Sequence, residues 1–252
     1  MVKWENRFEL KKDRWVYVPT KQMRLSGTKI HNHLRAKWIP PLYFYHLRAG
    51  GHVACAKKHL RSRYFALIDI KNFFESTGQS RLTRELKTYL TYNEARQVAK
   101  LSTVSNPLPE GPKYIVPYGY PQSPILSTFC LHKSFCGNLF KQLNATPDIE
   151  ISIYMDDIIL SSDDLSSCES AYDLICEGLE RSGYQVNTLK SQSPSEKIHV
   201  FNLELKQSSL RVLPFRFVEF LIAYTKSKNP HVRKGIASYV GSVNVDQARH
   251  FR

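Results

Sequence analysis

The sequence predicts a mixed α+β fold, in which short strands that carry acidic residues alternate with amphipathic helices. Apolar residues alternate along Ile151–Leu160, and the adjacent acids Asp156 and Asp157 interrupt them, as at the tip of a β-hairpin. A second apolar strand begins the segment Tyr64–Phe74. The leucines of Ser80–Leu90 recur at helical spacing, which indicates a helix after that strand.

The remaining elements follow from local signals along the chain. A basic strand pair is expected around Leu10–Pro19, and the proline-rich stretch Asn106–Pro112 is expected to be a loop. After the acidic hairpin, Ser166 or Ser167 can cap a helix that runs through Glu180, and Gly183 suits its end.

Two acidic sites stand out because each lies at the end of an apolar strand. Asp69 ends the first strand, and Asp156 follows it by 87 positions, so only the fold could bring the two together. Neighbouring carboxylates repel one another unless cations offset their charge, and Mg²⁺ prefers carboxylate and phosphate oxygens. Two converging acid sites are what two-metal phosphoryl transfer requires.

Five segments in this order resemble the motifs of the reverse transcriptase family in its bacterial form, as in retron and group II intron enzymes. The segments are Asp69–Ser76, Pro117–Ser127, Tyr154–Asp157, Gly183–Lys190 and Phe201–Leu205, the last resembling a primer-grip hairpin. The series covers about residues 60–205 of the chain. Without a retron signature, the chain looks most similar to the small defence-associated or abortive-infection reverse transcriptases.

The resemblance implies an α+β right-hand polymerase with fingers, a ferredoxin-like palm and a short helical thumb. Residues 1–68 would form the fingers, and residues 69–205 the palm, with about 78–115 returning to the fingers. Residues 206–252 would form the thumb.

The same resemblance assigns the reaction chemistry to four side chains and one backbone carbonyl. Asp69, Asp156 and Asp157 would hold two Mg²⁺ ions, for which Mn²⁺ can substitute, and Ile70 would lend its backbone carbonyl. Lys190 matches a lysine that could protonate the leaving pyrophosphate or neutralise its charge.

Six residues are expected to contact the incoming nucleotide. Phe74 would lie beneath the sugar and clash with a 2′-hydroxyl, which favours deoxynucleotides. Tyr118 stands where most of the family carries Gln, and a phenol cannot reproduce the paired donor and acceptor of an amide. Gln122 offers an alternative register for that amide. The others are Lys12 and Arg14, which would grip the triphosphate, and Gly119, which allows close backbone approach.

The net charge of +14 is concentrated near the N-terminus. Residues 1–68 hold 15 lysines and arginines against three acids. Residues 142–180, in contrast, hold ten acids and contain no lysine or arginine. Because aromatic side chains are interleaved with the basic ones, this segment is expected to bind RNA. The residues expected to contact RNA are Lys21, Arg24, Lys29, Arg35 and Lys37.

The composition indicates where the protein is located and whether its cysteines bind metal. No apolar run approaches the roughly 18 residues of a membrane span, and no signal peptide precedes the first strand, so a cytoplasmic protein without a membrane partner is expected. The five cysteines form no metal-binding pair and are expected to be reduced.

The resemblance, together with the basic N-terminal segment, implies an RNA-directed DNA polymerase that copies a dedicated, structured non-coding RNA in anti-phage defence. Its partners would be an RNA template, a DNA product, deoxynucleoside triphosphates and further copies of the chain, because a short thumb would hold a sliding duplex poorly. One alternative is an RNA polymerase or a template-independent nucleotidyl transferase. An alternative of another class is an RNA-binding scaffold with a vestigial polymerase site.

Overall fold

The computed structural model describes residues 2–251, which divide into two compact units. One unit comprises residues up to 42, 70–142 and 175–186, and the other comprises residues 43–69, 143–174 and 187 onward. We call them the first and second units. The boundary falls inside strand β3 (Tyr64–Lys71), between Asp69 and Ile70.

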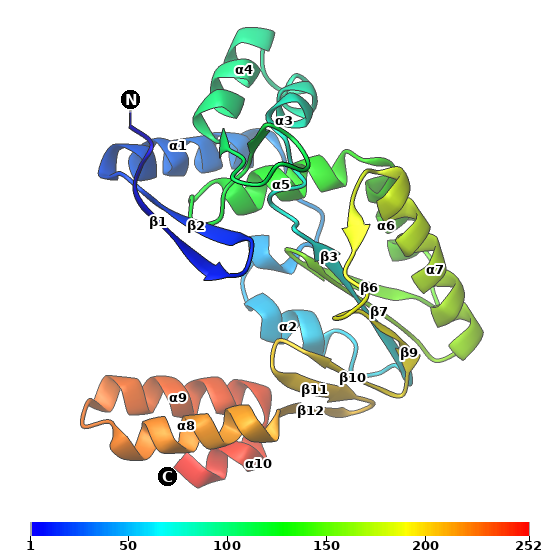
Figure 1. Cartoon of the computed structure of the whole chain (residues 1–252). Helices are drawn as coiled ribbons and strands as arrows, with labels where there is room; N and C mark the ends of the chain where they lie inside the picture. Colours follow the sequence, from blue (N-terminus) through cyan, green and yellow to red (C-terminus); the bar gives the residue numbers. More distant parts are fainter. Residues whose placement is uncertain (1, 252) are drawn as a thin grey trace. The chain divides into compact units, whose positions relative to one another are not determined.

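The first unit combines a two-stranded ribbon with helices (Figure 1). The ribbon consists of β1 (Trp4–Lys11) and β2 (Arg14–Pro19), as the sequence predicts. Its helices are α1 (Lys21–Lys37), α3 (Gln79–Leu86), α4 (Tyr92–Leu101), α5 (Ser123–His132) and most of α6 (Phe135–Asn144). The short strands β4 (Val104–Ser105) and β5 (Tyr114–Ile115) enclose the predicted proline-rich loop.

Caps define where the helices of the first unit begin. The Thr20 hydroxyl accepts a hydrogen bond from the Met23 N–H at the start of α1. Thr91 and Glu94 form a reciprocal capping box at the start of α4. A small core of buried side chains includes Tyr17, Met23 and Ile115, so the ribbon and α1 pack together.

The second unit is built on the strands that carry the acids. Strand β7 (Asp157–Ser162) pairs antiparallel with β6 (Glu150–Tyr154) on one side and with β3 on the other. Strand β9 (Gln192–Ser195) also lies beside β3 in this unit. The last two residues of β3, Ile70 and Lys71, belong to the first unit and pair there with β8 (Gln185–Val186). With α5 and α6 before β6 and α7 (Leu165–Arg181) after β7, the chain follows the βαββαβ order of a ferredoxin-like fold.

The start of α7 differs from the prediction. The cap is Asp164, whose carboxylate accepts hydrogen bonds from the Ser166 hydroxyl and the Ser167 N–H. Neither serine caps the helix, because the carboxylate one turn earlier satisfies the free N–H groups. Gly183 has a φ of 72° just beyond the helix, which agrees with its predicted role at the helix end.

One histidine ties together the two strands of the acidic hairpin. His59 is fully buried, with Nδ1 2.7 Å from the Ser161 hydroxyl on β7 and Nε2 2.7 Å from the Ser152 hydroxyl on β6. Burial lowers the pKa of His59 to about 3, so the ring is neutral at physiological pH. It therefore acts as a structural link within the sheet.

The rest of the second unit is a meander followed by helices. Strands β10 (Lys197–Val200), β11 (Leu203–Lys206) and β12 (Ser209–Val212) form the antiparallel meander. Helices α8 (Pro214–Lys226), α9 (Pro230–Val243) and α10 (Val245–Ala248) end the unit, and α8 lies beside α9 (Figure 1). Short helices Tyr45–Leu47 and Arg249–Phe251 and helix α2 (Gly51–Lys57) complete it.

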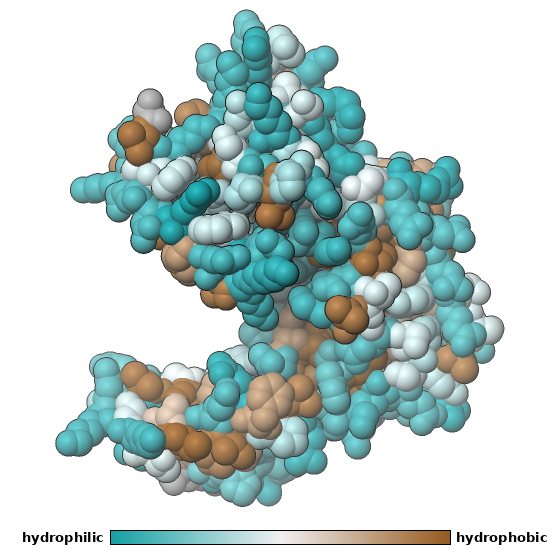
Figure 2. Space-filling model, viewed as in Figure 1, coloured by the Kyte–Doolittle hydropathy of each residue, from teal (hydrophilic) through white to brown (hydrophobic). Residues whose placement is uncertain are grey.

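Helix α8 differs from the other long helices because none of its residues is buried. Phe215, Val218 and Ile222 share one face of α8, and each side chain is about half exposed. Figure 2 shows apolar residues on the surface of these C-terminal helices. None of the helices of residues 2–251 combines the length and apolar character of a membrane-spanning segment.

Candidate polymerase site

The acidic hairpin places its two carboxylates on adjacent backbone positions. Tyr154 pairs with Asp157 across the hairpin, which leaves Met155 and Asp156 as the two turn residues. Asp156 therefore lies at the tip, as predicted, whereas Asp157 is the first residue of β7.

The fold brings the distant acid Asp69 to the same place. Asp69 pairs directly with Asp157 in the β3–β7 ladder, and residues opposite one another in an antiparallel pair point to the same face. The register thus joins two acids that the sequence separates widely. The predicted convergence of the strand-borne acids is present in the second unit.

A single turn after β8 surrounds Asp69 with hydrogen-bond donors. The Asn187 side-chain Nδ2 donates to Asp69 Oδ1 over 2.9 Å, and the Asn187 backbone N–H donates to the Asp69 carbonyl over 2.8 Å. Lys190 Nζ lies 2.8 Å from Asp69 Oδ2, and the Asp69 N–H donates to the Ser191 hydroxyl over 3.0 Å. Both carboxylate oxygens of Asp69 are therefore engaged, and its side chain is only 5% exposed.

The three acids of the site outnumber its one nearby lysine, so the negative charge is only partly compensated. Burial raises the pKa of Asp157 to about 8, with further increases from Asp156 and Asp69, and Lys190 opposes the shift only in part. A carboxyl group held by this environment is ready to exchange its proton for a cation. The donor chemistry therefore fits a divalent metal ion.

One oxygen of the Asp69 carboxylate is held in an ion pair by Lys190. Within residues 2–251, no three His, Cys, Asp or Glu side chains are grouped closely enough to hold a metal as they stand. The Lys190 ammonium takes the position next to Asp69 Oδ2, and its side chain is half exposed, so it has room to move aside. Ile70, whose carbonyl was also predicted to contact metal, is buried and pairs with Val186.

Four of the predicted nucleotide-binding residues gather in the first unit. The Phe74 ring meets the Tyr118 ring edge to face, with centroids 4.5 Å apart, and the Arg14 guanidinium lies 4.8 Å from the centre of the Tyr118 ring. Gly119 has a φ of 100°, and a Cβ atom there would overlap the Tyr17 carbonyl oxygen. Tyr118 also bridges to Val16 on β2, so the ribbon is fixed to this segment.

Two of the six residues are placed differently. Lys12 is exposed in the turn between β1 and β2, two residues before Arg14. Gln122 is fully buried, its Nε2 donates to the Ser102 hydroxyl over 3.3 Å, and its Oε1 faces Gly27 of α1. The Gln122 amide thus packs under α1, and the alternative register would require it to leave this position.

The five basic residues predicted to contact RNA all lie on α1, and all are exposed. No acid interrupts this helix. Met23, Gly27 and Leu34 form its buried face, which leaves the basic side chains directed to solvent. The helix is therefore an exposed basic surface, in agreement with the prediction from charge.

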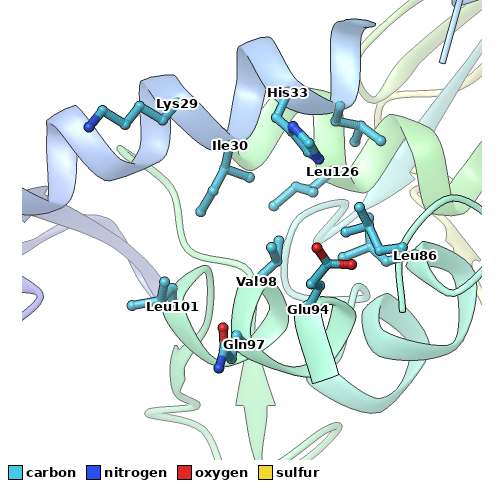
Figure 3. Close-up of a pocket in the computed structure, with 11 residues that line it drawn as sticks. Lys29, Ile30, His33, Leu86, Glu94, Gln97, Val98, Leu101 and Leu126 are labelled. Atoms are coloured by element: carbon cyan, nitrogen blue, oxygen red, sulfur yellow. The ribbon is translucent and has the colours of Figure 1, made fainter. Parts of the chain in front are cut away.

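An apolar cavity of about 380 Å³ also lies in the first unit, between α1, α4 and α5 (Figure 3). Its walls include Ile30, Leu86, Val98 and Leu126, and Lys29, His33, Glu94 and Gln97 stand at its rim. None of the predicted metal-binding or nucleotide-binding residues lines it. It is a packing gap between helices rather than a site for phosphoryl transfer.

Sequence reasoning missed Asn187 and Ser191, although both lie close to the predicted Lys190. Their signal was their position in the segment Gly183–Lys190 and just after it, where the chain turns back along β3. Only the three-dimensional turn reveals that both residues bond Asp69.

Comparison with known proteins agrees with this geometry. A family model for reverse transcriptase (RNA-dependent DNA polymerase) matches residues 8–217. Among solved structures, a foamy viral protease-reverse transcriptase in complex with double-stranded DNA is 16% identical, with a TM-score of 0.51 over 94% of this chain and 36% of that chain. A Candida albicans telomerase in complex with a fragment of telomeric RNA is 12% identical, with a TM-score of 0.51. The match covers 91% of this chain and 47% of the telomerase chain.

These two likenesses concern the fold alone, because the identities are low. The chain spans less than half of either solved chain. No curated protein matches the sequence.

Proposed function

Because the chain belongs to the reverse transcriptase family, we propose that it is an RNA-directed DNA polymerase. The observation that carries the proposal is the pairing of Asp69 with Asp157 across β3 and β7, next to Asp156 in the turn. In the proposed reaction, the 3′-hydroxyl of a primer attacks the α-phosphate of a deoxynucleoside triphosphate, and pyrophosphate leaves.

Different residues of the chain would bind the metal ions and neutralise the leaving group. Asp69, Asp156 and Asp157, with the Ile70 carbonyl, would hold two Mg²⁺ or Mn²⁺ ions. When bound, such ions stabilise the charge on the attacking and leaving oxygens. Lys190, released from Asp69, would carry its positive charge or its proton to the leaving pyrophosphate.

The aromatic cluster of the first unit would select the nucleotide. We propose that Phe74 reads the sugar, and that Tyr118 and Gly119 line the nucleotide position. Arg14 would bind the triphosphate with its planar fork, with Lys12 as a second cation. The contact of Arg14 with Tyr118 supports this grouping, because it places a cation at the aromatic pair.

We further propose that α1 docks the RNA through Lys21, Arg24, Lys29, Arg35 and Lys37. Their exposure and the absence of acids on α1 support this role. The RNA would be a dedicated, structured non-coding RNA, and the resemblance to defence-associated enzymes is the ground for proposing a role in anti-phage defence in the cytoplasm. The half-exposed apolar face of α8 supports a homo-oligomer.

Primer extension on an RNA template tests the proposed activity against its rivals. With one deoxynucleotide left out of the mixture, a templated polymerase stops at the position that requires it. Synthesis that continues past this position would favour a template-independent transferase, and equal use of ribonucleotides would favour an RNA polymerase. RNA bound without any product would favour the scaffold.

Reversal of charge on α1 tests the RNA surface separately. Replacing Lys21, Arg24 and Arg35 by Glu should remove copurifying RNA while the palm keeps its activity on a short primed template. A matched variant with three changes on the acidic helix α7 controls for general effects of charge. If RNA remains bound with its original salt dependence, the α1 proposal is wrong.

A further inference from the structure

We propose that His46 is a positioning residue that fixes the turn carrying Asp156, although it lies 109 positions from that turn and in none of the family motifs. The Met155 backbone N–H donates a hydrogen bond to His46 Nδ1 over 3.0 Å. The inference rests on the proposed function, because it assigns His46 a part in holding the same acids.

The turn needs such a restraint because its backbone is unfavourable. Met155 has a φ of 57° at the first of the two turn positions, as in a type II′ turn, where glycine is normally found. A bulky residue in this region stores strain, which persists only where the surroundings fix the conformation. An unrestrained turn would relax and move the side chain of the next residue, Asp156.

The segment that contains His46 is itself anchored to the hairpin. The Ile153 N–H donates to the Tyr43 carbonyl over 2.7 Å, and Phe44 forms a parallel bridge with Ile153. The His46 ring meets the Phe44 and Tyr154 rings edge to face, with centroid distances of 6.2 and 5.8 Å. Residues 43–46 therefore extend along β6 to the point where the turn begins.

The protonation state of His46 suits its role as an acceptor. An imidazole nitrogen accepts a hydrogen bond only when it carries no proton, so the ring must be neutral. Burial lowers the pKa of His46 to about 4, against the opposing effect of a hydrogen bond with the Ile153 backbone. The Nδ1 acceptor is thus available throughout the physiological range of pH.

Within residues 2–251, the Met155 N–H donates no hydrogen bond other than the one to His46. Loss of the His46 acceptor would leave this backbone donor without a partner at a strained position. The expected consequence is a misplaced Asp156 and a slower chemical step, with little change in the binding of primer, template or nucleotide.

Three substitutions separate this role from simple packing. His46→Leu keeps most of the volume and removes the acceptor, His46→Asn places an oxygen near the position of Nδ1, and His46→Gln places its polar end near the position of Nε2. His46→Leu should lower kcat by about fivefold to a hundredfold with KM unchanged, the range that corresponds to a backbone donor left without an acceptor. Asn should restore most of the rate, and Gln should restore less.

Amide hydrogen exchange of metal-free protein supplies a readout that does not depend on catalysis. The Met155 amide should be protected in the wild type and in His46→Asn, and should exchange faster in His46→Leu and His46→Gln. His250→Leu is the control, because His250 belongs to the same unit and its ring packs against Phe217 rather than against the hairpin. It should leave Met155 protection unchanged.

The outcomes separate this proposal from the proposed function. Wild-type protection of Met155 in His46→Leu would overturn the positioning role, as would equal rates for Asn and Gln. If His46→Leu does not fold, the comparison of Asn with Gln still decides the question. If the wild type makes no DNA but the exchange pattern is as expected, the restraint stands and the polymerase function fails.

Discussion

Asn187→Ala should slow DNA synthesis without unfolding the protein. The substitution removes the 2.9 Å hydrogen bond from Nδ2 to Asp69 Oδ1 and keeps the 2.8 Å bond from the Asn187 backbone to the Asp69 carbonyl. The turn should therefore keep its course. Water cannot readily replace the lost donor, because the Asp69 side chain is only 5% exposed.

The hydrogen bond lost in Asn187→Ala sets the expected decrease in kcat. A hydrogen bond to a charged group contributes about 1.5–3 kcal/mol. If the whole of this energy serves to orient the Asp69 carboxylate in the transition state, kcat should fall by about tenfold to a hundredfold, since about 1.4 kcal/mol corresponds to a factor of ten. Asn187→Asp should be worse, because it places a further negative charge against Asp69.

Primer extension across a range of Mg²⁺ concentrations measures both the rate and the apparent metal affinity of these variants. Leu189→Ala is the matched control, because Leu189 belongs to the same turn and its side chain is 96% exposed. If Asn187→Ala is as active as Leu189→Ala at every Mg²⁺ concentration, the argument that Asn187 orients Asp69 is refuted.

Three further predictions concern selectivity, backbone geometry and pH. Phe74→Val should raise ribonucleotide use relative to deoxynucleotide use in competitive incorporation, and an unchanged ratio would make Phe74 a packing residue. Gly119→Ala should lower the free energy of unfolding by at least about 1–2 kcal/mol in urea titrations, because of its positive φ, whereas Gly235→Ala, with open space around it, should not. For metal-free protein, Asp157 has a raised pKa, so the stability it contributes is complete below its unfolded pKa and is lost as pH rises toward about 8. Asp157→Asn should flatten that decline between about pH 5 and pH 8, and an unchanged slope would contradict the assignment.

The sequence alone was sufficient for the elements that have strong local patterns. The alternation along Ile151–Leu160 predicts the β6–β7 hairpin, and the apolar run before Asp69 predicts β3. Because Asp69 and Asp157 end and begin buried strands, the register that buries their apolar neighbours also brings the two acids together.

Features that depend on tertiary contact could not be predicted in this way. The bond between His46 and Met155 joins segments 109 positions apart, and no periodic pattern points to it. Gln122 was considered as a nucleotide contact because of its place in a motif, but its amide is buried beneath Gly27. The cap of α7 moved to Asp164 because a carboxylate satisfies free N–H groups at least as well as a serine hydroxyl does.

Primer extension by Asp156→Asn, on an RNA template with Mg²⁺ and deoxynucleotides, tests the central claim most directly. The amide fits the same turn but cannot supply the negative charge that a metal ion requires. The account predicts templated DNA from the wild type and none from the variant, with the same thermal unfolding midpoint for both metal-free proteins. Near-normal synthesis by Asp156→Asn would contradict the claim that the paired acids of β3 and the β6–β7 turn form the polymerase site.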